Sequence, residues 1–121
     1  MSPMQRSLKL LREAGYTCGI TERWNAFAHI RQDLYGCIDF LACQPGIGIV
    51  GVQVTTESEI QRHMDKCSDE KRLKDWLRSG GKFIIHAWAK RKPRGMVRPI
   101  HICRRYDVGL IDSILTFKEL P

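Results

Sequence analysis

The chain has 121 residues, of which 43% are apolar and 27% charged, and it carries a net charge of +7. This length favours one domain spanning residues 1–121, large enough to form a core without disulfides. No apolar run approaches the ~20 residues of a membrane span, and the first six residues lack the apolar stretch of a secretory signal. Five cysteines without a C-x-x-C pair favour reduced thiols. We therefore expect no membrane partner and a cytoplasmic location, in a prokaryotic or phage-infected host cell.

The positive charge is concentrated in one segment. Between Ala89 and Arg105 there are seven basic residues and no acidic one, so the rest of the chain is electrically balanced. Pro93 and Gly95 indicate a hairpin tip there. Basic side chains that neutralise phosphates release counterions, so we interpret the segment as a nucleic-acid surface. A solvated turn that only aids solubility is the alternative. The residues expected to contact nucleic acid are Lys90, Arg91, Lys92, Arg94, Arg98 and Trp24.

The N-terminal segment predicts an amphipathic helix. Ser2 as N-cap, proline at the next position and Gln5 three residues after the cap form a capping box, and apolar residues recur at helical spacing until Gly15 ends the helix. Residues 16–22 then read as a strand. Residues 25–35 show no clear period and are expected to form a loop or an irregular helix. Trp24, just before them, either stacks on a base or closes an edge of the core.

Two apolar runs, residues 36–43 and 47–55, flank a Gln-Pro-Gly turn signal. They predict a central hairpin whose strands are covered on both faces. A second capping box at 56–59 predicts the start of a helical region, which continues to the glycine pair at 80–81.

The C-terminal third predicts a strand over residues 82–88 and its hairpin partner over 96–103. The tail, residues 108–120, is ambiguous, and a short helix is one interpretation. Together the elements predict an α/β fold, with a central mixed β-sheet flanked by helices.

Two polar residues interrupt the apolar runs of the central hairpin. A carboxylate at Asp39 is costly to keep ionised without a cation, a metal or hydrogen-bond donors. If the strands pair, its oxygens and those of Gln53 could converge and hold a hard cation such as Mg²⁺. A divalent ion beside phosphate is a common means of phosphodiester cleavage. The alternative is a carboxylate that caps a neighbouring backbone group.

The segment from Asp33 to Ala42, followed by a turn and by Val50 to Thr55, resembles the core of the PD-(D/E)XK nuclease superfamily. It is most similar to the small Holliday-junction-resolvase-like and phage-type members. The resemblance covers roughly residues 4–88. It implies a restriction-endonuclease-like core and an Mg²⁺- or Mn²⁺-dependent nuclease that acts on DNA, frequently as a homodimer.

Within this resemblance, Asp39 matches the metal-binding Asp and Gln53 the Glu/Gln position. Thr55 departs from the pattern because it stands where the family has a lysine, and threonine cannot supply a positive charge. The early acid of the first helix is also absent, and Glu22 is its candidate replacement as a metal ligand, with a plain surface residue as the alternative. The candidates for the missing cation are Arg31, Arg62, Lys66 and His86.

The sequence thus favours a metal-dependent DNA endonuclease, with a structure-selective one as an option, and the catalytic candidates are Asp39, Gln53, Glu22, Thr55 and Arg31. A catalytically degenerate nucleic-acid-binding module on the same fold is the alternative. A protein-interaction subunit of a phage or mobile-element complex is a third hypothesis. RNA is not excluded as the ligand, because contacts to the backbone carry no sequence information.

Overall fold

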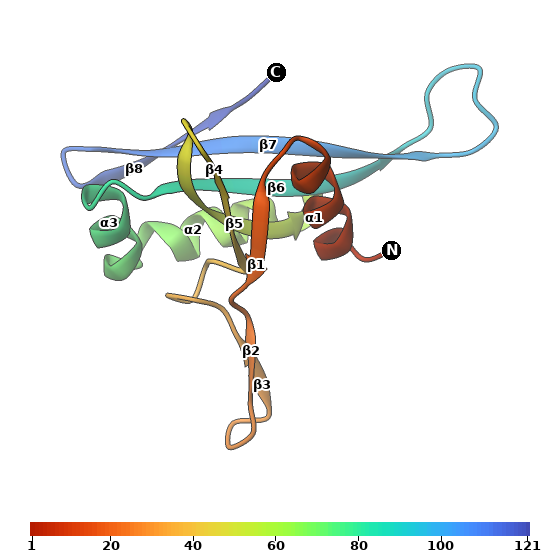
Figure 1. The fold of residues 1–121 in the computed structure, drawn as a ribbon. Coiled ribbons are helices and arrows are strands. Elements are labelled where there is room, and N and C mark those ends of the chain that lie inside the picture. Colours follow the sequence, from red (N-terminus) through yellow and green to blue (C-terminus); the bar gives the residue numbers. More distant parts are fainter.

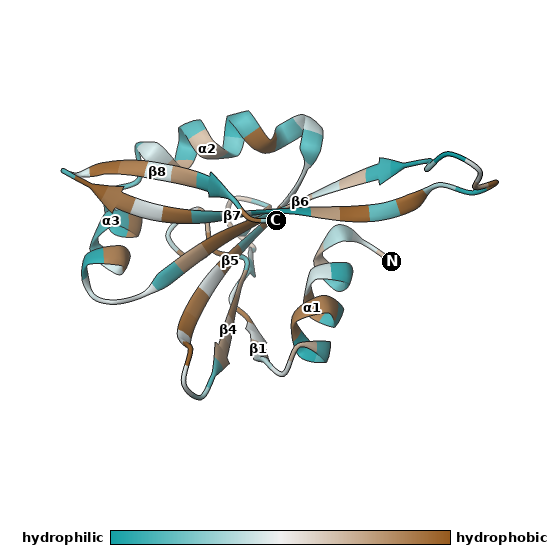
Figure 2. Cartoon of the chain, turned by 90° about the horizontal axis from the view of Figure 1, so that it is seen from above, coloured by the Kyte–Doolittle hydropathy of each residue, from teal (hydrophilic) through white to brown (hydrophobic).

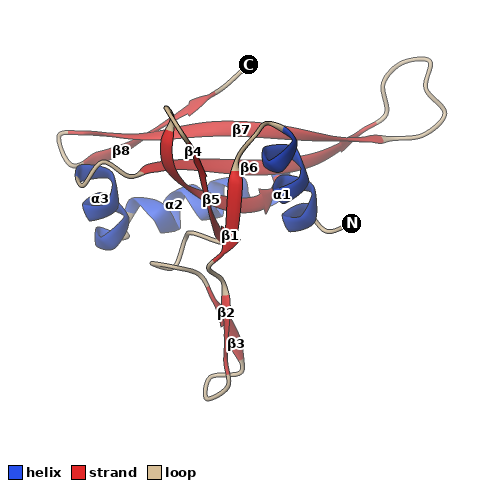
Figure 3. Cartoon of the chain, in the orientation of Figure 1, coloured by secondary structure: helices blue, strands red, loops and turns tan.

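The structure is a computed structural model that describes residues 1–121. It contains three α-helices, eight strands and one short 3₁₀ turn (Figure 1, Figure 3). The elements, in chain order, are α1 (Pro3–Glu13), β1 (Thr17–Ile20), β2 (Arg23–Asn25), β3 (Ile30–Gln32), β4 (Phe40–Gln44), β5 (Gly48–Thr56), the 3₁₀ turn (Glu57–Glu59), α2 (Ile60–Ser68), α3 (Lys71–Arg78), β6 (Lys82–Arg91), β7 (Ile100–Ile111) and β8 (Ile114–Glu119).

Six strands form one mixed sheet in the order β1-β4-β5-β6-β7-β8. The central pair β5 and β6 is parallel, and every other neighbouring pair is antiparallel. The parallel pair requires a crossover, which α2 and α3 supply. The predicted α/β fold with a mixed central sheet and flanking helices is confirmed. The strands β2 and β3 form a separate hairpin that projects from the body of the molecule (Figure 1).

The sheet buries a core on each face, because side chains alternate along a strand. On one face Leu8 and Leu11 of α1 pack against Phe40 and Val52. On the other face α2 and α3 cover a second core, to which Phe83 and Ile85 of β6 contribute. Figure 2 shows α1 and α2 on opposite sides of β6. None of the helices has the length and hydropathy needed to traverse a lipid bilayer.

The first helix begins as its sequence predicts. The Gln5 N–H donates to Ser2 Oγ over 3.2 Å, and the Ser2 N–H donates to Gln5 Oε1 over 2.8 Å, which completes the capping box. The second predicted box does not form. Thr56 makes no capping hydrogen bond and instead contacts Ser58 Oγ, so the chain first makes a 3₁₀ turn and α2 begins at Ile60.

The expectation of a loop or irregular helix over residues 25–35 is wrong for Asn25 and residues 30–32, which are strands of the β2–β3 hairpin, whereas residues 26–29 form its turn. Trp24 pairs with Arg31 across it. Asn25 Oδ1 accepts the N–H groups of Phe27 and Ala28, and His29 has a φ of 54°, so the tip is held by local turn chemistry. Neither strand has a buried face, and the apolar alternation that signals a strand is therefore missing.

The C-terminal tail is strand rather than helix. Asp112 and Ser113 both have positive φ, 49° and 65°, which is the backbone of a two-residue type I′ turn. This turn joins β7 to β8 and pairs Ile111 with Ile114. The apolar residues of the tail alternate toward the sheet face, with Leu115 buried and Ile114 exposed, so a strand buries them better than a short helix.

Gly81 is a position where the close approach of a side chain requires glycine. A Cβ added there would lie 2.4 Å from the Trp76 ring, whose Nε1 donates to the carbonyl of Lys82. We expect Gly81→Ala to lower the free energy of unfolding by about 1–3 kcal/mol, because the indole must move. Gly19→Ala, which meets no atom within 4 Å, is the matched control and should change stability little. Equal urea midpoints for the two variants would contradict this role of the Trp76 contact.

Candidate active site

Three acidic side chains form a cluster at one end of the sheet. Glu22, Asp33 and Asp39 each offer a carboxylate oxygen, and these oxygens lie within 4.8 Å of one another. Asp39 is 7% exposed, and the other two are half-buried. Glu22 directly precedes β2, Asp33 directly follows β3, and Asp39 directly precedes β4. The cluster therefore lies where the β2–β3 hairpin leaves the sheet.

A tight turn brings Asp33 and Asp39 together. Leu34 and Ile38 form an isolated antiparallel bridge, with N···O distances of 2.8 and 2.9 Å. Tyr35 and Gly36 close the turn between them in the left-handed region, with φ of 55° and 71°. The two aspartates flank this bridge on opposite strands, so antiparallel geometry places them side by side. The predicted strand over residues 36–43 is shorter as a result and begins at Phe40.

Glu22 is held against Asp39 by the backbone. The N–H groups of Thr21 and Glu22 both donate to the carbonyl of Asp39 over 3.1 Å, and Thr21 Oγ1 donates to the carbonyl of Ile38. This end of β1 is thus tied to the start of β4. The arrangement fixes the backbone beneath two of the three acids before any ligand binds.

The Asp39 carboxylate is buried but has a firm hydrogen bond. The Val54 N–H donates to its Oδ2 over 2.7 Å. Burial raises the pKa of Asp39 to about 8, helped by a hydrogen bond with Asp33 and by the charges of Asp33 and Glu22, and opposed by the Val54 N–H. Below that pH a proton shared with Asp33 keeps the cluster from carrying its full negative charge. A divalent cation could take over this role, since carboxylate oxygens are its preferred ligands.

The cluster lines a pocket of about 410 Å³. Thr55, which is 7% exposed, and Glu59 also line this pocket. No lysine or arginine lines this pocket. Two arginines pair with acids that line it: Arg31, whose Nη1 lies 3.6 Å from Glu22 Oε1, and Arg62, whose Nε lies 2.6 Å from Glu59 Oε2.

Gln53 does not line the acidic pocket. Its side chain is 1% exposed, and its Oε1 accepts the thiol hydrogen of Cys67 from α2 over 3.5 Å. The expected convergence with Asp39 is replaced by a different partnership, because the chain bends at Asp39 and its carboxylate turns to the Val54 N–H. The third acid of the cluster is Asp33, which the sequence analysis did not select as a site residue. The sequence feature that could have identified Asp33 is the Tyr35-Gly36 turn, which has Asp33 before it and Asp39 after it.

His86 is excluded as the missing cation of this site. It lies on the α1 face of β6, fully buried, with Nδ1 2.9 Å from Ser7 Oγ. Burial, with the nearby charge of Arg105, lowers the pKa of His86 to about 4, so its ring is neutral near pH 7. Its Nε2 has no hydrogen-bond partner. His86 lines a different pocket, with Leu10 and Leu11 of α1, and does not line the acidic one.

A basic pocket of about 780 Å³ adjoins the acidic one, and Asp33 lines both. Four cationic side chains contribute to it from three parts of the chain. Arg72 is paired with Glu70 over 2.7 Å and lies over the Tyr35 ring. No ion pair involves the other α-helical cation, Lys66, or the hairpin residue Arg23. The cationic lining residues are Arg23, Arg31, Lys66 and Arg72.

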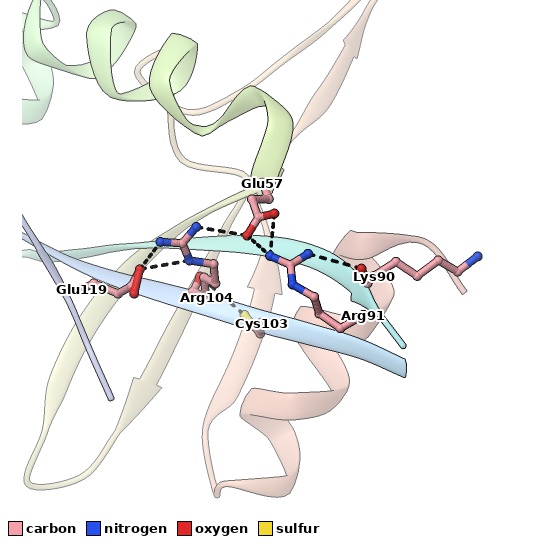
Figure 4. A network of polar contacts seen from close by, with 6 residues as sticks. All are labelled: Glu57, Lys90, Arg91, Cys103, Arg104 and Glu119. Carbon is pink, nitrogen blue, oxygen red and sulfur yellow. Dashed lines mark hydrogen bonds and ion pairs between the residues drawn. The ribbon is translucent and has the colours of Figure 1, made fainter. Parts of the chain in front are cut away.

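The basic segment forms the second projecting arm, at the β6–β7 hairpin (Figure 1). Arg91 and Arg104 are not free there, because both donate to Glu57, and Arg104 also donates to Glu119 (Figure 4). This network braces the 3₁₀ turn against β6 and β7. Arg91 was expected to contact nucleic acid, but its charge is already paired with Glu57. The exposed basic residues of the segment without an ion pair are Lys90, Lys92, Arg94, Arg98 and Arg105, and Arg105 donates to the carbonyl of Pro121.

Trp24 lies on the β2–β3 hairpin and is 57% exposed, so it does not close a core edge. Its ring packs edge-on against His29, with centroids 6.3 Å apart. The structure thus places Glu22, Arg31, Asp39 and Thr55 close to one another, and it directs Gln53 into the interior. Comparison with protein-family models, with curated proteins and with solved structures finds no match to this chain.

Proposed function

We propose that the protein is a metal-dependent DNA endonuclease with a restriction-endonuclease-like core. The observation that carries the proposal is the cluster of three carboxylates around a buried aspartate, next to a pocket with four cationic side chains. The element order supports it: a helix, an antiparallel run β1-β4-β5, a helical crossover and a parallel β6. This order agrees with the superfamily that the sequence resembles.

The donor set fits a hard divalent cation. Glu22, Asp33 and Asp39 would hold Mg²⁺ or Mn²⁺, since all three offer carboxylate oxygens and no thiol or imidazole lies among them. The bound ion would supply Lewis-acid stabilisation of the charge that develops on the phosphate. The Val54 N–H orients the Asp39 carboxylate for this task.

The remaining groups have roles in binding and positioning. Arg23 and Lys66 in the basic pocket would contact the phosphates that flank the scissile bond, because neither is neutralised by an acid. Arg31, which pairs with Glu22 of the cluster, would replace the lysine that Thr55 does not provide. The exposed lysines and arginines of the β6–β7 arm would hold a more distant part of the DNA backbone.

The test is cleavage of linear, supercoiled and branched DNA in Mg²⁺ and then in Mn²⁺. We expect wild-type cleavage with either ion, and a loss of about a thousandfold for Asp39→Asn, because metal-ion stabilisation is worth several kcal/mol at about 1.4 kcal/mol per tenfold. Asp69→Asn, at the exposed C-terminal end of α2, is the matched control and should cleave normally. Unimpaired cleavage by the Asp39 variant would refute the assignment.

A catalytically degenerate DNA-binding module is the second candidate, and Thr55 favours it. No basic side chain lines the acidic pocket, so the charge that the family's lysine provides is missing there. This alternative predicts salt-sensitive DNA binding by the wild type without cleavage in either metal ion. Thr55→Lys in the same assay separates the two, since cleavage that appears only in this variant identifies a degenerate site.

A further inference from the structure

The β2–β3 hairpin presents apolar side chains to solvent beside the acidic cluster. Phe27 at its tip is 99% exposed, Trp24 57% and Ile30 50%. The hairpin has only three residue pairs and stands away from the sheet (Figure 1). Such a protrusion contributes no core, so its large apolar side chains do not stabilise the fold. Trp24 and Ile30 occupy adjacent positions of the register and so point to opposite faces of the hairpin, which leaves apolar surface for a partner on both faces and at the tip.

The tip is ordered by its own turn chemistry. Asn25 Oδ1 accepts two backbone N–H groups, at 3.0 and 3.1 Å, and the Trp24 ring packs edge-on against His29. The side chain of Phe27 is therefore presented on a preorganised turn, and little ordering entropy is lost when a partner binds.

The charges around the hairpin identify the partner. Arg23 and Arg31 lie on its two strands and line the basic pocket at its base. Aromatic side chains beside arginines form the stacking and phosphate contacts with which proteins bind unpaired nucleotides. A second copy of the chain fits less well, because three large apolar side chains cannot supply the roughly 800 Å² per partner of a stable interface.

The two ends of the hairpin are acids of the cluster. Glu22 directly precedes β2, and Asp33 directly follows β3. Phe27 is five residues beyond Glu22, which at about 3.3 Å per residue puts the tip at most roughly 16 Å from this acid. At 3.4 Å per nucleotide along one strand, this corresponds to at most about five nucleotides of duplex. The length of the hairpin thus sets the distance between a partner bound at its tip and the acidic cluster.

We infer that the β2–β3 hairpin is a wedge that stacks on the first unpaired base where duplex DNA becomes single-stranded, and so selects forked substrates. The inference rests on the proposed nuclease function and names its substrate class. It places incision within about five nucleotides of the fork, by the spacing of extended chain and of stacked duplex.

The test separates binding from cleavage. A forked duplex with 2-aminopurine at its first unpaired position and a blunt duplex of equal length are titrated without divalent ions. We expect wild type to prefer the fork by about tenfold, the scale of one base–aromatic stack, and Phe27→Ala to lose this preference while keeping its affinity for blunt duplex. Ile114→Ala, which replaces an apolar residue that is 69% exposed at the start of β8, is the control and should match wild type.

Cleavage products of the same fork are then mapped in Mg²⁺ and Mn²⁺. A fork preference that depends on Phe27, without cleavage in either ion, supports the wedge and refutes the nuclease. Equal binding and cleavage of fork and blunt duplex, unchanged in Phe27→Ala, overturns the wedge and leaves the nuclease standing. A dimer in light scattering that Phe27→Ala dissolves also overturns it, because the tip would then bind a second copy.

Discussion

Mn²⁺ at a hundredfold excess over its dissociation constant is expected to raise the melting temperature of the wild-type protein by about 10 °C at pH 8.5. The excess corresponds to about 2.7 kcal/mol of linked stabilisation, and a chain of this size gains roughly 4 °C per kcal/mol. Asp39→Asn should remove nearly the whole effect, because the buried carboxylate of the cluster is lost. Differential scanning fluorimetry with and without the ion measures both.

The size of this stabilisation should depend on pH. With a pKa of about 8, Asp39 holds a proton at pH 6 that the metal must displace. Apparent Mn²⁺ affinity should therefore fall by up to about tenfold per pH unit below 8. Calorimetry at pH 7 in buffers of different ionisation enthalpy should detect about one proton released per ion bound.

The metal-free protein should show the opposite trend. Because the folded-state pKa of Asp39 is raised above the ordinary value of 3.8, the folded state binds more protons than the unfolded state between about pH 4 and pH 8. This stabilising contribution is present at low pH and is lost as pH rises through the folded-state pKa. Asp39→Asn removes the cost of burying this charge and should stabilise the metal-free protein at pH 8.5 by several kcal/mol, at about 1.4 kcal/mol for each pH unit by which the pKa is raised. An Asp39 variant that is less stable at pH 8.5 and still stabilised by Mn²⁺ would rule out this site.

Neutralising the β6–β7 arm is expected to have the second large effect. Replacing Lys92, Arg94 and Arg98 by Gln should weaken DNA binding by about 500-fold at 0.1 M salt and reduce the slope of log affinity against log salt by about 2.7, at 0.9 per phosphate contact. None of the three forms an ion pair, so each is available to a phosphate. Fluorescence anisotropy of a labelled duplex across salt concentrations measures both quantities.

The control for this variant removes equal charge elsewhere. Replacing Lys9, Lys71 and Lys118 by Gln also lowers the net charge by three, but on α1, α3 and β8. We expect a change in affinity of less than about tenfold, since charges outside the contact surface act through a screened field. Equal losses in the two triple variants would show that net charge, rather than the arm, governs binding.

Asp39 and Gln53 illustrate how far sequence reasoning carries. Both stood out as polar residues in apolar strands, and both are buried. Only Asp39 reaches the acidic pocket, whereas Gln53 accepts a hydrogen bond from Cys67 in the interior. Burial follows from the local apolar pattern, but the direction of each side chain depends on where the strand begins and bends.

Asp33 shows the converse case. It does not lie within an apolar run, so nothing in the local sequence marks it as a site residue. It lies beside Asp39 because the Leu34–Ile38 bridge folds the chain back. The β2–β3 hairpin was not predicted for a related reason. Its strands have no buried face, so apolar and polar residues do not alternate along them.

The capped first helix, the central hairpin, the basic arm and the buried acid at position 39 could all be predicted from the sequence. Each of these depends on local signals: a capping box, a turn between apolar runs, or a concentration of one charge. Three features could not be predicted: which acids lie together, which arginines form ion pairs, and on which face of the sheet His86 lies. Those outcomes depend on strand register and on contacts between distant segments, and a register shift of one residue reverses the face of every side chain in a strand.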